Sequence, residues 1–567
     1  MDIAVKKLTK SNMKNNMKKR ILALIFAALL LSGCAAKDAG VSGASGKDKT
    51  GKYNLSESGE AVINDEGCEN AVATEDNYRV FYEIFVGSFS DSDGDGTGDL
   101  RGIIDRMDYL NDGDDDSGLS LGVEGIWLSP IFKSKSYHKY DVDDYYQIDP
   151  EFGTEADLKE LIDLCHERNV KVILDLVLNH TGFNNPWFSA FRGAHINGDE
   201  TDPYYDFYVY YSEGETPPSG RTFASVPGTK DFYECNFSGD MPELNYDNEA
   251  VREAVLDVAK YYIDLGIDGF RFDAAKYIYF GDDVQSAEFW KWYIGELKEL
   301  KPDIYTVAEV WDSDSVTDYY YPALNCFDFT TSQTSGLIAQ TAQAGDVNKY
   351  TSYVDDYLER VQALNDGAMI VPFIANHDTD RAAGYLTEAS GQMKIAANLY
   401  ILSSGSPFIY YGEEIGARGS RGGSNTDANR RLKMEWGDGD KVSDPEGADY
   451  GSQRVGATVF EQLSDGGSLL SYYKKLIMIR KANPAIARGD YTALSFSGTK
   501  VGGFTAALDG KTVAVIHNTT NSEQTVDLSS AGISKADLSA FIGVGEASLE
   551  GTVLTISEKT SAVLNVG

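Results

Sequence analysis

Three carboxylic acids stand at the ends of β-type runs that lie far apart along the chain. Asp273 ends the alternating run Gly-Phe-Arg-Phe-Asp, Glu309 lies just beyond the apolar run at 305–307, and Asp378 lies just beyond the run at 369–374. Two carboxyl groups can divide the cleavage of a glycosidic bond, one attacking the sugar and the other protonating the leaving oxygen, while a third stabilises the cationic transition state. These acids therefore indicate chemistry at a glycosidic bond.

Neighbouring residues fit this division of roles. Arg271 lies two residues before Asp273, so both side chains project from the same face of a strand, and the positive charge would keep Asp273 ionised. Glu309 has to act as an acid near neutrality, which requires a raised pKa. Trp311, two residues further on, is expected to help by excluding water.

The elements that must position these residues alternate between strand and helix. Helices are expected at 156–168, 249–265, 287–300, 392–402 and 468–481, and strands at 80–86, 125–128, 172–176, 269–273, 305–309, 325–329, 369–373 and 407–410. Eight successive β-then-α units predict an α/β fold of the (β/α)₈ TIM-barrel type, in which one mouth collects the C-terminal end of every strand.

Two parts of the chain depart from this alternation. Between His180 and Asn248 there is no clear helix but many aromatic, Gly, Pro and Asn residues, which predicts a subdomain inserted after the third strand. Beyond Pro484 short alternating runs predict an antiparallel β-domain. The expected boundaries are 77–180 and 248–484 for the barrel, 181–247 for the inserted subdomain and 485–567 for the C-terminal β-domain.

Four segments together resemble the signature regions of the α-amylase family, glycoside hydrolase family 13, and the likeness extends from about residue 79 to the C-terminus. They are Asp175-Leu-Val-Leu-Asn-His180, Gly269-Phe-Arg-Phe-Asp273-Ala-Ala-Lys276, Ala308-Glu309-Val-Trp311 and Ala375-Asn-His377-Asp378. The resemblance implies a retaining enzyme with Asp273 as nucleophile, Glu309 as general acid/base and Asp378 as transition-state stabiliser. A covalent glucosyl-Asp intermediate is implied as well.

The resemblance also implies residues that bind the sugar. His180 and His377 would hydrogen-bond sugar hydroxyls at the cleavage point, and Tyr140, with His138 beside it, would offer an aromatic platform to the apolar face of glucose. Lys276 matches a position on the leaving-group side. With Arg271, these residues form the expected substrate-binding set.

The implied substrate is an α-glucan, namely starch and its maltooligosaccharides. Ala274, directly after the nucleophile, resembles members that act on α-1,4 bonds, whereas the Met241-Pro-Glu-Leu-Asn245 segment is intermediate between family types. Endo or exo action therefore stays open. The alternatives are an exo-α-glucosidase or glucanotransferase with the same intermediate and, from another class, a non-catalytic glucan-binding lipoprotein.

An acidic, glycine-containing loop follows the first strand and predicts a Ca²⁺ site. Alternating oxygens around a turn are ligands that Ca²⁺ accepts, but the twelfth position is Gly102 rather than Glu and no EF-type helices flank the loop. The predicted ligands are Asp91, Asp93, Asp95, the carbonyl of Thr97, and Asp99. A second calcium site known in the family would use Asn179, but Tyr277 stands where its His partner is expected, so that site is doubtful.

Composition excludes some partners. The 567 residues carry a formal charge of -38, which would repel nucleic acid and anionic membrane surfaces and suits a neutral substrate. Cys68, Cys165, Cys235 and Cys326 are scattered without metal-type pairs, so neither a disulfide framework nor a catalytic thiol is expected.

The N-terminus has the features of an export signal. Lys18, Lys19 and Arg20 precede a short apolar run at 21–31, and the ending Leu-Ser-Gly-Cys34 resembles a bacterial lipoprotein signal in which Cys34 becomes the lipid-bearing N-terminus. Residues 1–34 would be the signal with its lipidated cysteine and 35–76 a flexible tether. The expected location is the cell surface, anchored to the bacterial membrane; the oligomeric state stays open.

Overall fold

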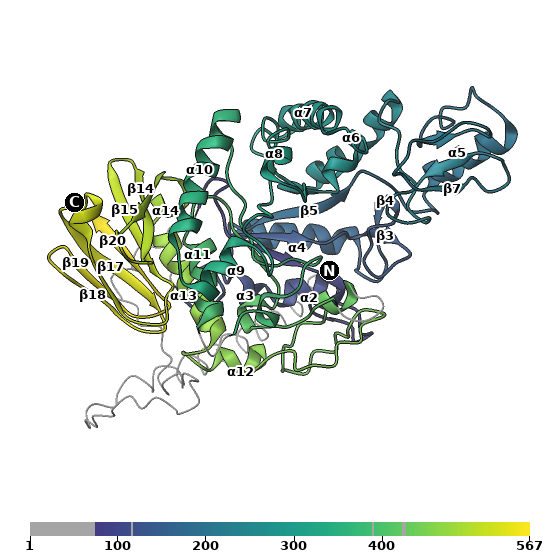
Figure 1. Cartoon of the computed structure of the whole chain (residues 1–567). Coiled ribbons are helices and arrows are strands. Elements are labelled where there is room, and N and C mark those ends of the chain that lie inside the picture. The colour runs from purple at the N-terminus through teal and green to yellow at the C-terminus, as the bar shows by residue number, and fades with distance from the viewer. Residues whose placement is uncertain (1–73, 115–116, 388–390, 422–426) are drawn as a thin grey trace, which may run out of the picture. The chain divides into compact units, whose positions relative to one another are not determined.

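The computed structural model describes residues 74–114, 117–387, 391–421 and 427–567, and a curled parallel sheet lies at its centre (Figure 1). The strand order is β11-β10-β9-β5-β2-β1-β12. The strands are β1 (Phe81–Ile84), β2 (Gly125–Leu128), β5 (Lys171–Val177), β9 (Gly269–Asp273), β10 (Tyr305–Ala308), β11 (Asn325–Cys326) and β12 (Phe408–Tyr410). Seven of the eight predicted strands are therefore present near their predicted places.

The remaining predicted strand, at 369–373, closes the barrel without forming a regular ladder. Val371 makes a parallel bridge to Phe327 beyond β11, and Phe373 makes one to Phe408 of β12. Pro372, between the two bridges, has no N–H to donate, which limits regular pairing. Because β11 and β12 are the two edges of the sheet, this segment joins them, and the predicted (β/α)₈ barrel is confirmed.

Side chains fill the barrel from one face of its strands. Phe81 of β1 and Tyr305 of β10 come from strands that are not neighbours in the sheet, yet their ring centroids lie 4.5 Å apart. Trp127 and Phe327 likewise approach to 5.5 Å. These buried residues form an apolar layer inside the barrel.

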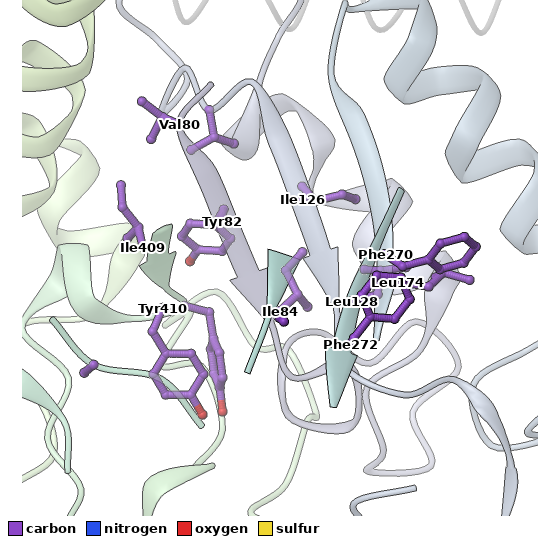
Figure 2. Packing of buried hydrophobic residues seen from close by; sticks show 14 of the residues in the cluster. Val80, Tyr82, Ile84, Ile126, Leu128, Leu174, Phe270, Phe272, Ile409 and Tyr410 are labelled. Carbon is purple, nitrogen blue, oxygen red and sulfur yellow. The ribbon is translucent and has the colours of Figure 1, made fainter. Parts of the chain in front are cut away.

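The other face of each strand packs on the helices. A second apolar cluster, larger than the layer inside the barrel, lies on this side; it includes Tyr82 and Ile84 of β1 and Phe270 and Phe272 of β9 (Figure 2). Successive side chains of a strand point to opposite faces. Glu83, between Tyr82 and Ile84, therefore shares the interior face.

Helices surround the barrel, and their ends carry recognisable caps. Thr154 and Asp157 form a capping box at the start of α4, while Asn248 caps α6 and Gly266, with φ of +111°, ends it. All five predicted helices are present to within a few residues. The helices outside the inserted subdomain are α2 (Leu100–Asp105), α3 (Met107–Leu110), α4 (Glu155–Glu167), α6 (Glu249–Leu265), α7 (Asp283–Leu300), α8 (Asp314–Thr317), α9 (Leu337–Ala344), α10 (Asn348–Leu364), α11 (Gln392–Ile401), α12 (Val459–Leu463), α13 (Leu469–Ala482) and α14 (Ala485–Arg488).

The segment between His180 and Asn248 contains a helix, so the prediction that it has none is wrong. Helix α5 (Pro186–Asn197) starts at Asn185, whose side chain accepts from the Trp187 N–H, and buries Phe188, Phe191 and His195 on one side. Its high aromatic content concealed the helical spacing. A small sheet of β6 (Tyr210–Tyr211), β8 (Phe232–Glu234) and β7 (Phe223–Ser225) accompanies it. The hairpin β3 (Phe132–Ser134) and β4 (Val142–Ile148) precedes it along the chain.

The last part of the chain is the predicted antiparallel β-domain, seen in yellow in Figure 1. Its five-stranded sheet has the order β13-β14-β15-β20-β17 and its three-stranded sheet β16-β19-β18. Asn398 of α11 donates to the carbonyl of Ile542, which ties this domain to a barrel helix. The strands are β13 (Asp490–Ser495), β14 (Gly502–Leu508), β15 (Lys511–Asn518), β16 (Gln524–Asp527), β17 (Ala536–Gly543), β18 (Ala547–Glu550), β19 (Val553–Ile556) and β20 (Thr560–Val566).

The predicted signal segment, the lipidated Cys34 and the tether up to residue 73 lie outside the described residues. Within the described ranges, no helix is long and apolar enough to cross a membrane. Cys165, Cys235 and Cys326 are free and buried, as expected of a chain without a disulfide framework in this part.

Candidate active site

A cavity of about 390 Å³ lies at the C-terminal ends of the barrel strands, and all three predicted catalytic acids line it. This is the end at which a parallel barrel collects its functional groups. The predicted sugar-binding residues His138, Tyr140 and His180 line the same cavity. The structure thus brings together six residues that the sequence spreads over 241 positions, from 138 to 378.

One buried guanidinium organises two of the acids. Arg271 donates through Nη1 to Asp273 Oδ1 and to Asp175 Oδ1, each at 2.7 Å, and through Nη2 to Glu309. Arg271 and Asp273 share a face of β9, as predicted, and Asp175 pairs with Arg271 in the β5–β9 register. Since the Arg271 side chain is 1% exposed, water screens these contacts little.

The backbone after Asp273 holds Glu309 in place. Ala274 has φ of +49°, in the left-handed region that non-glycine residues rarely enter. This turn directs the Ala274 N–H to Glu309 Oε2 at 3.4 Å and the Ala275 N–H to the Glu309 carbonyl at 3.1 Å. These hydrogen bonds connect the end of β9, at Asp273, to Glu309, which follows β10, and they hold Ala274 in its strained conformation.

Glu309 has the electrostatic setting that an acid requires. Burial raises the pKa of Glu309 to about 7, with Asp273 and Asp378 acting in the same direction and Arg271 opposing them. The side chain is therefore partly protonated near neutrality.

Asp378 lies in the opposite setting. Burial disfavours its charge, but His377, Arg431 and Arg271 outweigh burial and hold the pKa of Asp378 well below its usual range. Arg431 Nη2 is 2.6 Å from Asp378 Oδ1, and His377 Nε2 is 3.1 Å from Oδ2. Asp378 is therefore a permanent anion facing the cavity.

Tyr140 and His138 are positioned by contacts to their neighbours. The Tyr140 hydroxyl donates to Asp175 at 2.9 Å and lies 2.6 Å from His377 Nε2. Its ring stacks on His377 with centroids 5.4 Å apart. Burial and Arg431 lower the pKa of His138 to about 4, so His138 is neutral at pH 7.

His180 has an unused hydrogen-bonding atom at the cavity. Its side chain is buried, and Nε2 finds no hydrogen-bond partner among the described residues. Burial lowers the pKa of His180, so the ring is a neutral imidazole. A buried polar atom without a partner is costly, and a hydroxyl bound in the cavity would satisfy it.

Two of the predicted sugar-binding residues, His377 and Lys276, are bound to protein groups and do not line the cavity. His377 is fully buried, and both ring nitrogens already have protein partners, Glu83 at Nδ1 and Tyr140 with Asp378 at Nε2. His377 is therefore held by protein groups and does not line the cavity. Lys276 binds Asp312 at 2.9 Å and the carbonyl of Trp311 at 3.0 Å instead of lining the cavity.

Sequence reasoning missed three charged residues of this site. Asp175 opens one of the four signature segments but has no predicted role, and Arg431 lies in an irregular stretch without any motif. Glu83 had a signal, because a carboxylate inside the apolar run 80–86 must be buried in a central strand and needs a partner. That partner, His377, is 294 residues away along the chain.

The structure brings three carboxylates of the predicted calcium loop close together. Side-chain oxygens of Asp91, Asp93 and Asp99 lie within 4.8 Å of one another, so these three fit a single cation. Gly94 and Gly96 have φ of +88° and +101°, which a side chain would strain.

The other two predicted calcium ligands, Asp95 and Thr97, are hydrogen-bonded to each other. Asp95 Oδ1 accepts the Thr97 N–H at 2.7 Å, and Asp95 lies outside the three-carboxylate cluster. Gly96 accepts from Ser443 N–H at 2.8 Å, so the loop also supports the stretch that follows Arg431. The donor set is acidic and oxygen-only, as a hard cation prefers.

Asn179, the residue expected at the doubtful second calcium site, is buried and bonded within the protein. Its carbonyl accepts from Leu244 at 3.1 Å. Nearby, Arg221 pairs with Glu234 at 3.0 Å and donates to the carbonyl of Phe280 at 2.8 Å. A guanidinium thus links the inserted subdomain to the segment after β9.

Comparisons with known proteins point to one family of enzymes. A family model described as Alpha amylase, catalytic domain, matches residues 83–489. Alpha-amylase 3 of Dictyoglomus thermophilum is 35% identical over 457 residues, covering 79% of this chain and 85% of that protein. A 4-alpha-glucanotransferase of Thermotoga neapolitana is 30% identical, covering 78% of this chain and 96% of that protein. Among solved structures, Eubacterium rectale Amy13B has a TM-score of 0.82 at 33% identity, covering 90% of this chain and 99% of that one.

Proposed function

This chain belongs to the α-amylase family of glycoside hydrolases, and we propose that it hydrolyses α-1,4-glucosidic bonds of starch and maltooligosaccharides with retention of configuration. The observation that carries the proposal is the convergence of Asp273, Glu309 and Asp378 on one cavity. A neutral glucan also suits a protein with a formal charge of -38.

In the first half of the reaction, a carboxylate oxygen of Asp273 attacks the anomeric carbon. As the glycosidic bond breaks, Glu309 gives its proton to the departing oxygen, so the products are a glucosyl ester of Asp273 and a shortened glucan. Arg271 lies between both acids and places them side by side, the arrangement of retaining enzymes, whose two carboxyl groups are about 5 Å apart.

In the second half, ionised Glu309 removes a proton from a water molecule as the water oxygen attacks the anomeric carbon. The ester bond to Asp273 then breaks, which frees the Asp273 carboxylate. The anion of Asp378 faces the same cavity and stabilises the positive charge that develops on the sugar in both steps. The ring of Tyr140 offers a stacking surface, and His180 Nε2 is available to a sugar hydroxyl.

A glucanotransferase is the second candidate, because a 4-alpha-glucanotransferase is among the similar proteins. In addition, Phe237 and Tyr277 line the cavity and pack edge-to-face with centroids 5.2 Å apart. Phe237 is 48% exposed, so this aromatic pair offers a surface on which an acceptor sugar can stack. The same glucosyl ester would then pass to a sugar hydroxyl instead of water.

Product analysis separates these functions. The protein is incubated with maltoheptaose, amylose and pullulan, each with and without glucose as acceptor, and products and newly formed anomers are followed over time. Hydrolysis predicts shorter maltooligosaccharides that are released as the α-anomer. Products longer than the substrate would show that the protein is a transferase, and glucose alone, released from the chain end, would show an exo-glucosidase. Release of the β-anomer first would contradict the retaining mechanism.

We also propose that the loop 91–99 binds structural Ca²⁺, with Asp91, Asp93 and Asp99 as its carboxylate ligands. The double change Asp93→Ala and Asp95→Ala should lower the melting temperature in calcium by roughly 3–5 °C, because binding to the folded state alone adds stability. In chelator, the variant and the parent protein should melt together.

The control is Asp537→Ala, an exposed residue of β17, which should respond to calcium as the parent does. Differential scanning calorimetry gives the readout. An equal calcium shift in parent and loop variant would remove the calcium proposal.

We propose further that Cys34 is lipidated and holds the enzyme at the cell surface, on the evidence of the signal-like sequence before it. Radiolabelled palmitate should enter the parent protein and should not enter Cys34→Ala, which should be found outside the membrane fraction. Cys68→Ala, which alters the other cysteine of the N-terminal region, should be labelled like the parent. Equal labelling of the Cys34 variant, or no labelling of the parent, would refute the anchor.

A further inference from the structure

Glu83 is a buried carboxylate in the first barrel strand that no predicted role uses. It is 1% exposed and lies among apolar neighbours of β1. Its Oε1 is 2.6 Å from Nδ1 of His377 and 3.3 Å from the backbone N of the same residue. An ionised carboxylate buried this deeply needs a charged or strongly donating partner, and His377 is that partner.

The other side of the His377 ring faces the catalytic groups. Nε2 lies 3.1 Å from Asp378 Oδ2 and 2.6 Å from the Tyr140 hydroxyl. The Tyr140 hydroxyl donates its hydrogen to Asp175, so it can only accept from His377. Both ring nitrogens therefore face acceptors.

This pattern of acceptors defines the protonation state of the ring. A neutral imidazole has one N–H and would leave a nitrogen lone pair against a carboxylate, at Glu83 or at Asp378. The doubly protonated ring donates on both sides. Although burial opposes the charge, Asp378 and Glu83 raise the pKa of His377 to about 10, in agreement with the geometry.

The charges that surround His377 come from several elements. Glu83 belongs to β1, Asp175 to β5 and Arg271 to β9. Glu309 directly follows β10, and Asp378 lies in the same turn as His377. Arg431 donates from Nε to the His377 carbonyl at 3.1 Å. Carboxylates outnumber guanidinium groups around the ring, which favours the imidazolium. The titratable and charged groups are Glu83, Tyr140, Asp175, Arg271, Asp273, Glu309, Asp378 and Arg431.

We propose that Glu83 is a positioning residue for the reaction, which holds His377 as an imidazolium so that the ring fixes Asp378 and Tyr140 from behind the cavity. This inference rests on the proposed function for its kinetic readout only. Glu83 touches no substrate in this arrangement and acts through His377. Its removal should weaken turnover much more than ground-state glucan binding.

The test is Glu83→Gln in the full chain, which keeps an oxygen acceptor for Nδ1–H and removes the charge. The matched control is Glu124→Gln, another buried barrel glutamate, whose Oε2 accepts the Val80 N–H at 3.2 Å and which has no contact with His377 in the structure. Protein with ¹⁵N-labelled histidine has six imidazoles, and His377→Gln identifies the His377 signal.

In the parent and in Glu124→Gln, His377 should show the imidazolium ¹⁵N pattern at pH 8. In Glu83→Gln it should show the neutral pattern at pH 8 and regain the charged one at lower pH. The kcat of Glu83→Gln on maltoheptaose should fall roughly tenfold or more at pH 8, and its ratio to the parent kcat should rise as the pH falls to 5, since His377 is protonated again. KM should change much less.

A neutral His377 in the parent at pH 8 would overturn the proposal, and this measurement needs no variant other than the one used for assignment. A pH-independent loss of kcat in Glu83→Gln with an unchanged imidazolium signal would also overturn it, because Glu83 would then be only structural. If the protein turns over no glucan but the ¹⁵N signals of His377 behave as expected, the role of Glu83 in keeping His377 protonated is retained and only the proposed substrate is refuted.

Discussion

Asp273→Asn should lower kcat on maltoheptaose by about 10⁴-fold or more, while glucan binding changes by only a few-fold. The amide has the shape of the carboxylate and can still accept from Arg271, but it cannot form the glucosyl ester with the anomeric carbon. Initial rates and calorimetric binding of maltoheptaose to the same preparation measure the two effects.

Asp163→Asn, an exposed residue of α4 whose side chain is 58% exposed, is the control and should match the parent protein. Because the Asn substitution is nearly isosteric, both variants should melt close to the parent. Retained turnover in Asp273→Asn would contradict the assignment of the nucleophile. Lost binding with lost turnover would instead assign Asp273 to substrate binding.

Glu309→Gln should produce the second large effect, and that effect should depend on the leaving group. With maltoheptaose, the rate should fall by about 10²–10⁴-fold, because the departing oxygen no longer receives a proton. With α-maltosyl fluoride, whose fluoride leaves without protonation, the first, fluoride-releasing step should be far less affected. A pre-steady-state measurement of fluoride release isolates this step.

The pH dependence of the parent protein should have the same origin. Glu309 must be protonated to act as an acid, and burial raises its pKa to about 7, so kcat/KM on maltoheptaose should fall as the pH rises through about 7. Asp378, with its pKa held well below the usual range, should stay ionised throughout this window. Two results would argue against Glu309 as the acid. One is a similar loss of rate in Glu309→Gln with maltoheptaose and with α-maltosyl fluoride. The other is a fall of kcat/KM above pH 7 that persists in Glu309→Gln.

The barrel was predictable because its signals are local. Strands β2 and β9 and helix α6 have the predicted bounds, since alternation and helical spacing are properties of neighbouring residues. The strand at 369–373 was also predicted, but Pro372 reduces it to isolated bridges. Helix α5 was missed, because an aromatic-rich segment with Gly residues looks like a loop until a tertiary contact selects its buried face.

The sequence by itself determined which acids meet at the barrel mouth and that Arg271 and Asp273 share a strand face, because strand order and a period of two are encoded locally. Only the tertiary structure decided which of these acids are ionised and which residues hold them in place. Glu83, Asp175 and Arg431 reach the site from distant parts of the chain, and no spacing rule relates them to Asp378. The charge on His377 follows from Asp378 and Glu83, which outweigh the opposing effect of burial, and the protonation of Glu309 follows from burial together with Asp273 and Asp378. Both are properties of packed neighbours rather than of any short segment.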